Sequence, residues 1–518
     1  MIDQSSKNIK LGTIITYITQ FLGIGISFVY VPIMLRILGQ AEYGLYALVQ
    51  SIISYLQMSE MGIGTTATRY NSKYIAEGDK EGQKTINGMF LKMYFGIAGV
   101  CVIIAAILFC FLDVIYADYS KQSIQLIKTL FVIAVLNLVI TFVFQIFNAI
   151  IIAYEHYIFL KIITLIQTIL GPISMLIVLC LGYRSIGMLC VTTVISLLFG
   201  LTQMFFCLKK FKIKFAFKGH NRDLFKKIFS FTIFVFINSL ANQMMINSDK
   251  VIISIVMTEY EVAVYAIVMQ FHTYSYNFAN VLSGFYLPRF TKMLAKRGEI
   301  TDELFSALIK TGRIQVFVAG LMLGGFLTIG RPFIIRWVGT EYVEAYWLTI
   351  IILLTEVFGA AQSMFNALMQ AMNLHKARAV ISLLISVVKI FLTVIMTLQF
   401  GLLGCASAFF IGWWIRQIVF NVYYKRTVGI DIKAFWVEMA KIFLPLTFTI
   451  VILSIGMWVV QILIPAQNYM LILFYVCLYL LLYGGIMWCI ALEPYEKTFV
   501  KELFRRVGRK NTSSLFKE

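Results

Sequence analysis

The chain has 518 residues, of which 60 % are hydrophobic and 13 % charged, and its formal net charge is +19. A typical soluble domain is about 45–50 % apolar and about 25 % charged. A water-soluble core cannot bury so large an apolar excess, so the composition excludes a soluble globular protein and predicts that lipid surrounds much of the chain.

Fourteen runs of roughly 20 apolar residues follow one another along the chain, each bounded by charged or turn residues. Because lipid offers backbone N–H and C=O groups no partner, each run is predicted to be a transmembrane helix. The predicted spans are residues 11–37, 43–67, 88–112, 128–153, 158–182, 185–208, 228–257, 262–288, 312–338, 344–371, 377–400, 402–423, 440–464 and 468–492.

The spans are predicted to form an all-α integral membrane protein with two bundles. Spans 1–6 make up an N-terminal bundle in residues 1–210, and spans 7–12 make up a second bundle in residues 228–424. A basic cytoplasmic linker at 211–227 joins them, and residues 425–518 hold spans 13 and 14 and a basic cytoplasmic tail.

The distribution of Lys and Arg predicts the orientation. With the amino terminus inside, the inner segments hold 35 of the 44 Lys and Arg residues, the outer loops six and the spans three. Cytoplasmic loops of membrane proteins are enriched in these residues. A nucleic-acid partner is disfavoured, because the sequence contains no basic groove interleaved with aromatic residues. We expect a multi-pass plasma-membrane protein with both termini in the cytoplasm.

The two halves of the chain resemble each other. Residues 42–49 (EYGLYALV) match residues 261–268 (EVAVYAIV) at an offset of 219. Three polar residues then recur at an offset of 220: Gln50 with Gln270, Gln57 with Asn277, and Arg69 with Arg289. A nearly constant offset that joins polar positions predicts a duplication. With both copies inserted the same way up, the two bundles are predicted to enclose a central cavity, where transporters usually bind their substrates.

Amide side chains in spans 2, 7 and 8 are candidates for lining this cavity. Those that we expect to face it are Gln50, Gln57, Asn242, Gln270 and Asn277. In span 7, Gln243, Asn247 and Lys250 share a different helix face from Asn242 and Asp249. The alternative for such residues is helix–helix packing, where hydrogen bonds contribute about 0.6–2 kcal/mol each.

Two adjacent charges lie inside span 7. Asp249 and Lys250 are about 12 Å from its outer end along the helix, and an ionised group there costs at least ~2.5 kcal/mol unless it is paired or hydrated. We interpret them as a site for substrate, proton or cation, with Asp249 as the coupling residue. The alternative is a charge pair in which Lys250 reaches towards the interface. Glu356, Lys389 and Arg416 are predicted to pair with one another in the second bundle.

Arg69 and Arg289 end spans 2 and 8 at the cytoplasmic face. Guanidinium groups form bidentate contacts with phosphate, so the two residues are candidates for a basic collar that captures a diphosphate. As the alternative, snorkelling and the enrichment of basic residues in cytoplasmic loops easily explain one such Arg. No catalytic residue, metal site or cofactor is predicted, because the eight cysteines form no C-x-x-C pair and the four histidines are scattered.

Several stretches resemble one known family. Residues 32–46 (PIMLRILGQAEYGLY), residues 60–64 (EMGIG) and the pair Asp249-Lys250 before residues 261–265 (EVAVY) are similar to bacterial polysaccharide-repeat-unit flippases. These belong to the multidrug/oligosaccharidyl-lipid/polysaccharide exporter superfamily. Ala263 stands where relatives often have Gly.

The resemblance implies a transporter and not an enzyme. Such flippases move an undecaprenyl-diphosphate-linked oligosaccharide from the inner to the outer leaflet by alternating access, for capsule or O-antigen assembly. The resemblance implies headgroup roles for Arg69, Lys250 and Arg289, sugar-facing roles for the five amides, and a polysaccharide polymerase and glycosyltransferases as partners. Two alternatives stay open: a cation-coupled multidrug or small-solute antiporter of the same superfamily, and a membrane sugar polymerase or ligase.

Overall fold

The computed structural model describes residues 2–60, 62–217, 222–279, 293, 301–372, 374–465, 468–498 and 501. In these residues the chain is helical and contains no strand, which confirms the predicted all-α class. Contacts between Cα atoms divide the chain into two units. Unit 1 comprises Met1–Ala266 and Lys376–Phe409, and unit 2 comprises Ile267–His375 and Phe410–Glu518.

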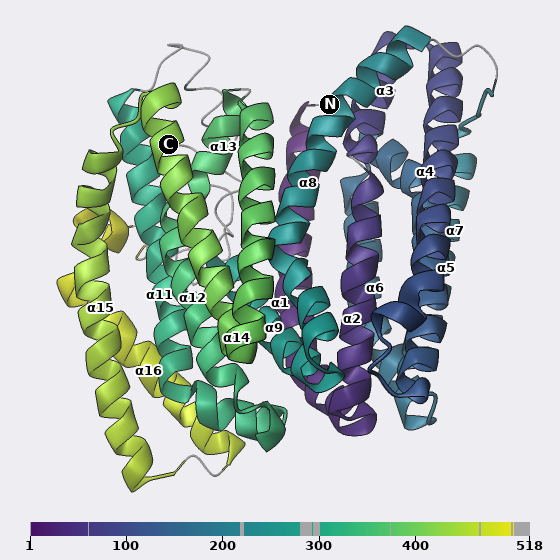
Figure 1. Ribbon diagram of the computed structural model, residues 1–518. Coiled ribbons are helices and arrows are strands. Elements are labelled where there is room, and N and C mark those ends of the chain that lie inside the picture. Colours follow the sequence, from purple (N-terminus) through teal and green to yellow (C-terminus); the bar gives the residue numbers. More distant parts are fainter. Residues whose placement is uncertain are drawn as a thin grey trace. The chain divides into compact units, whose positions relative to one another are not determined.

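Unit 1 is a bundle of long helices (Figure 1). Its helices are α1 (Ile2–Leu38), α2 (Gln40–Gln57), α3 (Ile63–Glu77), α4 (Lys80–Ile115), α5 (Lys121–Ala153), α6 (Tyr157–Cys180), α7 (Arg184–Phe206) and α8 (Arg222–Val256), with the start of α9 (Glu259–Ala279) and the first part of α14 (His375–Tyr423). The most extensive contacts in this unit join α1 to α6, α5 to α7 and α4 to α5.

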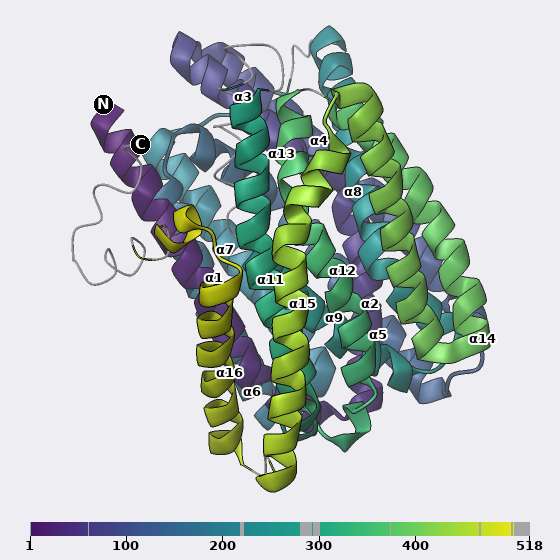
Figure 2. The ribbon, with the colours of Figure 1, turned by 90° about the vertical axis from the view of Figure 1, so that its left-hand side faces the viewer.

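The described residues of unit 2 contain the rest of α9 and α14 with five further α-helices (Figure 2). These are α11 (Asp302–Trp337), α12 (Ala345–Ala361), α13 (Ser363–Ala371), α15 (Ile432–Leu463) and α16 (Tyr469–Ile490). Helix α11 lies at its centre and packs against α12, α15 and α16. The sequence placed residues 228–424 together in a second bundle, whereas the contacts group α8 and residues 376–409 with the N-terminal helices.

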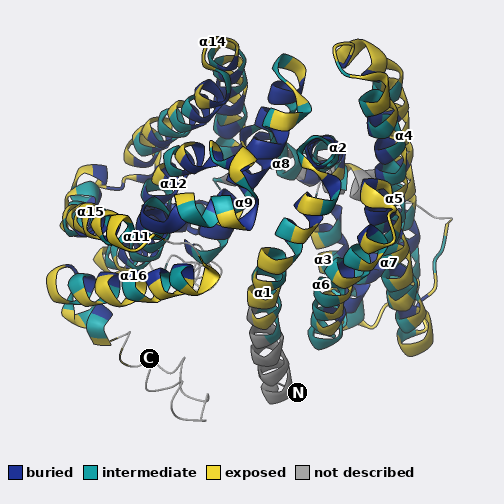
Figure 3. Ribbon diagram, turned by 90° about the horizontal axis from the view of Figure 1, so that it is seen from below, coloured by how far each residue is buried: buried dark blue, intermediate teal, exposed yellow. Residues whose placement is uncertain are grey.

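Large apolar side chains cover the outward faces of many helices, which Figure 3 shows as exposed positions along α4 and α15. Leu444 is 73 % exposed, Leu463 is 76 % exposed and Leu481 on α16 is 75 % exposed. Soluble proteins rarely expose continuous apolar surface of this extent, because water disfavours it. These faces are suited to contact with acyl chains.

All fourteen predicted spans coincide with helix, in whole or in part. Nine helices of the described chain are long and apolar enough to cross a membrane, or ten if the bent pair α12 and α13 is one span. The stretch Lys376–Val428 counts once among the nine. At 1.5 Å per residue it would be about 80 Å long, far more than a hydrocarbon core of about 30 Å, so it must hold two spans. It breaks at Gly401, whose φ of +59° is not helical, and this separates the two predicted spans 377–400 and 402–423.

The remaining predicted spans lie on α2, α8 and α9, which are not among the nine. Each carries several polar residues, such as Gln50 on α2, Asp249 on α8 and Gln270 on α9, and these lower its mean hydropathy. That these three helices cross the membrane stays a prediction. So do the orientation of the termini and the duplication.

Two predicted spans are not single straight helices. Span 2 ends as α2 at Gln57, continues as a short 3-10 turn at Met58–Glu60, and resumes as α3 after Gly62, which has a φ of +66°. The Glu60 carboxylate accepts a hydrogen bond from the Gly64 N–H at 3.3 Å, which satisfies one backbone donor at the start of α3. Span 10 is the pair α12 and α13, bent by 47° at Gln362.

The described part of the basic linker lies along α4. The Ala216 N–H donates to the Lys84 carbonyl at 2.9 Å, and the Lys92 ammonium donates to the Phe217 carbonyl at 2.7 Å. A Cβ atom added at Gly88 would be 1.9 Å from the Ala216 carbonyl oxygen. Only glycine at this position lets the linker backbone approach α4 so closely.

Candidate functional site

A buried charge cluster joins α8, α9 and the first part of α14 within unit 1. The Asp249 carboxylate is fully buried and forms an ion pair with the equally buried Lys389 ammonium. The same carboxylate accepts hydrogen bonds from the Tyr265 hydroxyl at 2.7 Å and the Thr393 hydroxyl at 3.4 Å. The Lys389 ammonium also donates to the Ser248 hydroxyl at 3.2 Å. Both charges are therefore compensated by polar partners, as buried charges require.

This cluster corrects the predicted pairing of the charges inside the spans. The prediction that Lys389 pairs with Glu356 and Arg416 is wrong, because Lys389 binds Asp249. Lys250 follows Asp249 in sequence but points elsewhere on α8, and its half-buried side chain forms no hydrogen bond or ion pair with another described residue. Two neighbouring residues on a helix diverge by about 100°, so one partner helix cannot contact both.

A second buried pair lies in unit 2. The imidazole Nε2 of His272 on α9 is 2.8 Å from the Glu356 carboxylate on α12, and both residues are 6 % exposed. The His272 ring also stacks on Tyr276, with ring centroids 6.3 Å apart. The guanidinium of Arg416 lies over the Phe420 ring at 5.7 Å. The sequence analysis did not predict a role for His272. A His and a Glu at similar depth in two predicted spans were the signal that could have indicated this pair.

The predicted sugar-facing amides are distributed over both units. In unit 1, Gln50 is half-buried, Gln57 is exposed and Asn242 is half-buried. In unit 2, the Gln270 amide donates to the Tyr274 hydroxyl at 2.6 Å. Asn277 is half-buried on the same helix. Their role in binding sugar stays a prediction.

The second polar face of α8 packs against α2 inside unit 1. The Gln243 amide donates to the Ser54 carbonyl at 3.3 Å and accepts, through its side-chain oxygen, a hydrogen bond from Asn247. The Tyr55 hydroxyl donates to the Gln243 backbone carbonyl at 3.4 Å. Gln243 therefore serves helix–helix packing, the alternative that the sequence left open.

The predicted basic collar consists of two arginines, of which the structure describes one. Arg69 lies on α3 with an exposed side chain, so its guanidinium is accessible to a ligand. Arg289 lies outside the described residues. In the part of the chain that the structure describes, no group of three or more His, Cys, Asp or Glu side chains could hold a metal ion.

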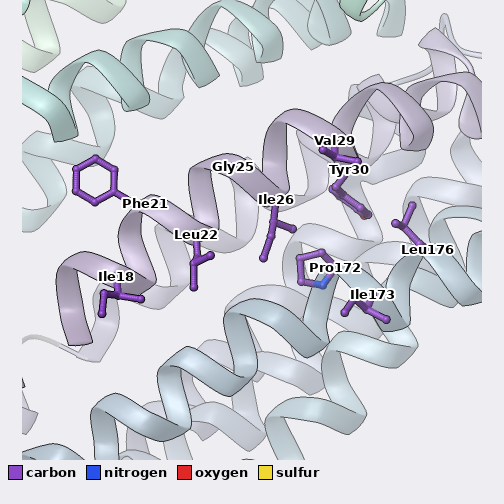
Figure 4. A pocket seen from close by; sticks show the side chains of 10 residues that line it. All are labelled: Ile18, Phe21, Leu22, Gly25, Ile26, Val29, Tyr30, Pro172, Ile173 and Leu176. Carbon is purple, nitrogen blue, oxygen red and sulfur yellow. The ribbon is translucent and has the colours of Figure 1, made fainter. Parts of the chain in front are cut away.

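An apolar groove of about 830 Å³ runs between α1 and α6 in unit 1 (Figure 4). It is lined by Ile18, Phe21, Leu22, Gly25, Ile26, Val29, Tyr30, Pro172, Ile173 and Leu176. The Tyr30 hydroxyl lies 3.3 Å from the Met175 sulfur and 3.8 Å from the Met188 sulfur. The charged cluster at Asp249 is not part of this lining, so the groove is suited to an apolar chain and not to a charged headgroup.

In a comparison with protein-family models, residues 9–294 match the family described as "Polysaccharide biosynthesis protein". That match covers more than half of the chain. The chain belongs to this family. No curated protein sequence matches it.

Solved structures with the same fold are transporters. A structure of the lipid II flippase MurJ in an inward closed conformation is 17 % identical, covers 96 % of this chain and 100 % of its own, and has a TM-score of 0.70. An inward-facing multidrug resistance MATE family transporter of the MOP superfamily is 13 % identical, with a TM-score of 0.62, and the match covers 79 % of this chain and 94 % of the transporter. At these identities the likeness is one of fold, and it confirms the fold predicted from the sequence. Both of these structural neighbours are transporters and not enzymes.

Proposed function

We propose that the chain flips an undecaprenyl-diphosphate-linked oligosaccharide from the inner to the outer leaflet by alternating access. The observation that carries the proposal is the match of residues 9–294 to a family of polysaccharide biosynthesis proteins. Together with a fold shared with a lipid flippase, it supports a transport step in making a polysaccharide. Sugar units for surface polysaccharides are assembled on a lipid carrier at the inner leaflet, so the step that remains is passage across the bilayer.

A lipid-linked substrate has three parts with different requirements. Its diphosphate needs cations, and the accessible Arg69 guanidinium and the Lys250 ammonium are the candidates among the described residues. Arg289 is the third proposed cation. Its sugars need hydrogen-bonding amides, for which Gln50 and Asn242 are proposed. Its prenyl chain needs apolar surface, which the groove between α1 and α6 offers.

The same fold also serves multidrug transporters, so the second candidate function is a cation-coupled antiporter. That function needs a carboxylate that an external cation can reach, and Asp249 was predicted to supply it. In this structure the Asp249 carboxylate is occupied by Lys389, Tyr265 and Thr393. A coupling role for Asp249 therefore requires that its ion pair opens during transport. The lipid-linked substrate is the better-supported alternative.

Deletion of the gene in its host, followed by analysis of lipid-linked intermediates, tests the proposal. We expect one complete sugar unit on its carrier to accumulate at the inner leaflet, and the wild-type chain to reverse this. Arg69→Gln should fail to reverse it, since it removes a proposed diphosphate ligand. Lys73→Gln is the matched control, because Lys73 is an exposed cation on the same helix that pairs with Glu77. Unchanged lipid intermediates together with altered dye efflux would favour the antiporter.

A further inference from the structure

We propose that His272 and Glu356 form a proton-binding site through which a pH gradient drives the transport cycle. The proposal rests on the proposed function, in that the transported species is a lipid-linked sugar. The proposed site is distinct from Asp249, and its ligand is a proton, which acts as the co-substrate of the transported lipid. The two residues lie in one unit, on α9 and α12, with His272 Nε2 at 2.8 Å from Glu356 Oε1.

The depth of the pair is the first reason. His272 lies about 20 Å from the start of α9, and Glu356 lies about 17 Å from the start of α12, along helices that rise 1.5 Å per residue. With α9 and α12 spanning a hydrocarbon core about 30 Å thick, as the sequence predicts, both positions would be close to the middle. Ionisable residues are rare at this depth, and transporters place their coupling sites there.

The helix that carries Glu356 is the second reason. Six residues after Glu356 the chain leaves α12 at Gln362 and bends by 47° into α13. At Gly359, between the carboxylate and this bend, the Trp413 ring lies 3.0 Å from where a Cβ atom would be. Broken helices supply the adaptable segments at binding sites in transporters. A change at Glu356 is therefore well placed to alter the geometry of the bend.

The charge of the pair is the third reason. A neutral imidazole beside an ionised carboxylate has a net charge of −1, and one further proton makes the pair neutral. Burial disfavours a net charge, so proton uptake stabilises the buried arrangement and proton loss favours one in which water reaches the pair. A ligand that binds two conformations unequally shifts the balance between them. Here the ligand is the proton, which shifts the balance between the buried and the hydrated arrangement of the pair.

Neighbouring charged and titratable groups do not replace either partner. In unit 2, those on α9, α11, α12, α14 and α15 are Tyr274, Tyr276, Asp302, Glu303, Lys310, Arg313, Arg331, Arg336, Tyr346, Arg416, Tyr423, Lys433, Glu438 and Lys441. Arg313 is bound by Glu496, and Lys441 is bound by Glu438. Arg331 lies near Tyr346. Glu356 is the carboxylate that faces His272.

The test uses the purified full-length chain in vesicles with a fluorescent undecaprenyl-diphosphate monosaccharide as the probe. Its distribution between the leaflets is measured with and without a pH gradient. For one coupled proton, a gradient of one unit shifts the equilibrium distribution by about tenfold. We expect this shift for the wild-type chain, its loss in His272→Gln and in Glu356→Gln, and its retention in His156→Gln. His156 is the matched control, since it precedes α6 in a connecting turn.

Proton binding is measured separately from transport, as the change of the thermal unfolding midpoint between about pH 5 and 8, where an unperturbed His titrates. A pH dependence that is lost in His272→Gln but kept in His156→Gln supports the site even if the probe is never flipped, and only the proposed function then fails. A wild-type chain that flips the probe equally with and without a gradient overturns the proton site and leaves the proposed function intact. The proton site is overturned in the same way if His272→Gln or His272→Asn keeps the tenfold shift.

Discussion

Replacing Asp249 by Asn should destabilise the chain strongly, because it leaves the Lys389 ammonium without a counter-charge. The Lys389 side chain is fully buried, and the partners it would keep are the Ser248 hydroxyl at 3.2 Å and the Phe409 ring, whose centroid is 5.6 Å from Nζ. Removing one member of a buried ion pair costs about 3–5 kcal/mol. Both contacts already exist in the wild-type chain, so neither replaces the lost counter-charge. We expect Asp249→Asn to lower the free energy of unfolding by about 3–5 kcal/mol.

The double variant Asp249→Asn with Lys389→Met separates this cause from others. It removes both charges and keeps a side chain of similar length in place of Lys389, while the Asn carbonyl can still accept from Tyr265. Because the unpaired charge is gone, most of the stability should return. Glu77→Gln is the control: the Lys73–Glu77 pair is 61 % and 52 % exposed, and such pairs contribute about 0–1 kcal/mol.

The assay is thermal or denaturant unfolding of the purified protein in detergent, with a double-mutant cycle over the two positions. A coupling free energy near zero would refute the reasoning, as would an Asp249→Asn variant that unfolds like the wild-type chain. Either result would mean that water or another anion already compensates Lys389.

Three further variants test other contacts. Gly44→Ala should cost about 1–3 kcal/mol of stability, because the new Cβ atom would be 1.9 Å from the backbone oxygen of Glu259. Gly96→Ala is the control and should be tolerated, because no atom lies within 4 Å of its new Cβ atom. Equal unfolding midpoints of the two variants would contradict this expectation. Arg313→Met should leave the buried Glu496 carboxylate without its partner at 2.9 Å and so expose the C-terminal segment after α16 to protease. Lys441→Met removes an exposed ion pair and should not change the cleavage rate. Identical cleavage rates for the two variants would argue against the Arg313–Glu496 contact. Arg69→Gln should reduce flipping of the fluorescent probe and leave the unfolding midpoint unchanged, since its side chain is exposed; an unchanged rate would remove Arg69 from the diphosphate site.

The all-α class and the fold could be predicted from the sequence because their signals are local. Apolar runs mark helices in lipid, and the break between spans 11 and 12 was predicted at Gly401, where a positive φ occurs. The interruption of span 2 near Gly62 was missed, although Gly62 and Gly64 lie in the predicted span. Apolar residues continue on both sides of that break and hide it from a hydropathy pattern.

The partners of the buried charges could not be predicted in the same way. The sequence indicates that Asp249, Glu356 and Lys389 need compensation, but the choice of partner depends on which helices touch and on how each is rotated. Lys389 binds Asp249 across more than a hundred residues of chain, and Glu356 binds His272. Both pairings result from tertiary packing that no spacing along the chain encodes.

Leaflet exchange of a fluorescent undecaprenyl-diphosphate sugar in vesicles that contain only the purified chain tests the central claim most directly. The probe is added to one leaflet, and its appearance in the other is followed by quenching from outside. We expect exchange that depends on the protein, is reduced by Arg69→Gln and is unaffected by Lys73→Gln. Exchange no faster than in protein-free vesicles would contradict the assignment of this chain as a flippase of lipid-linked sugars.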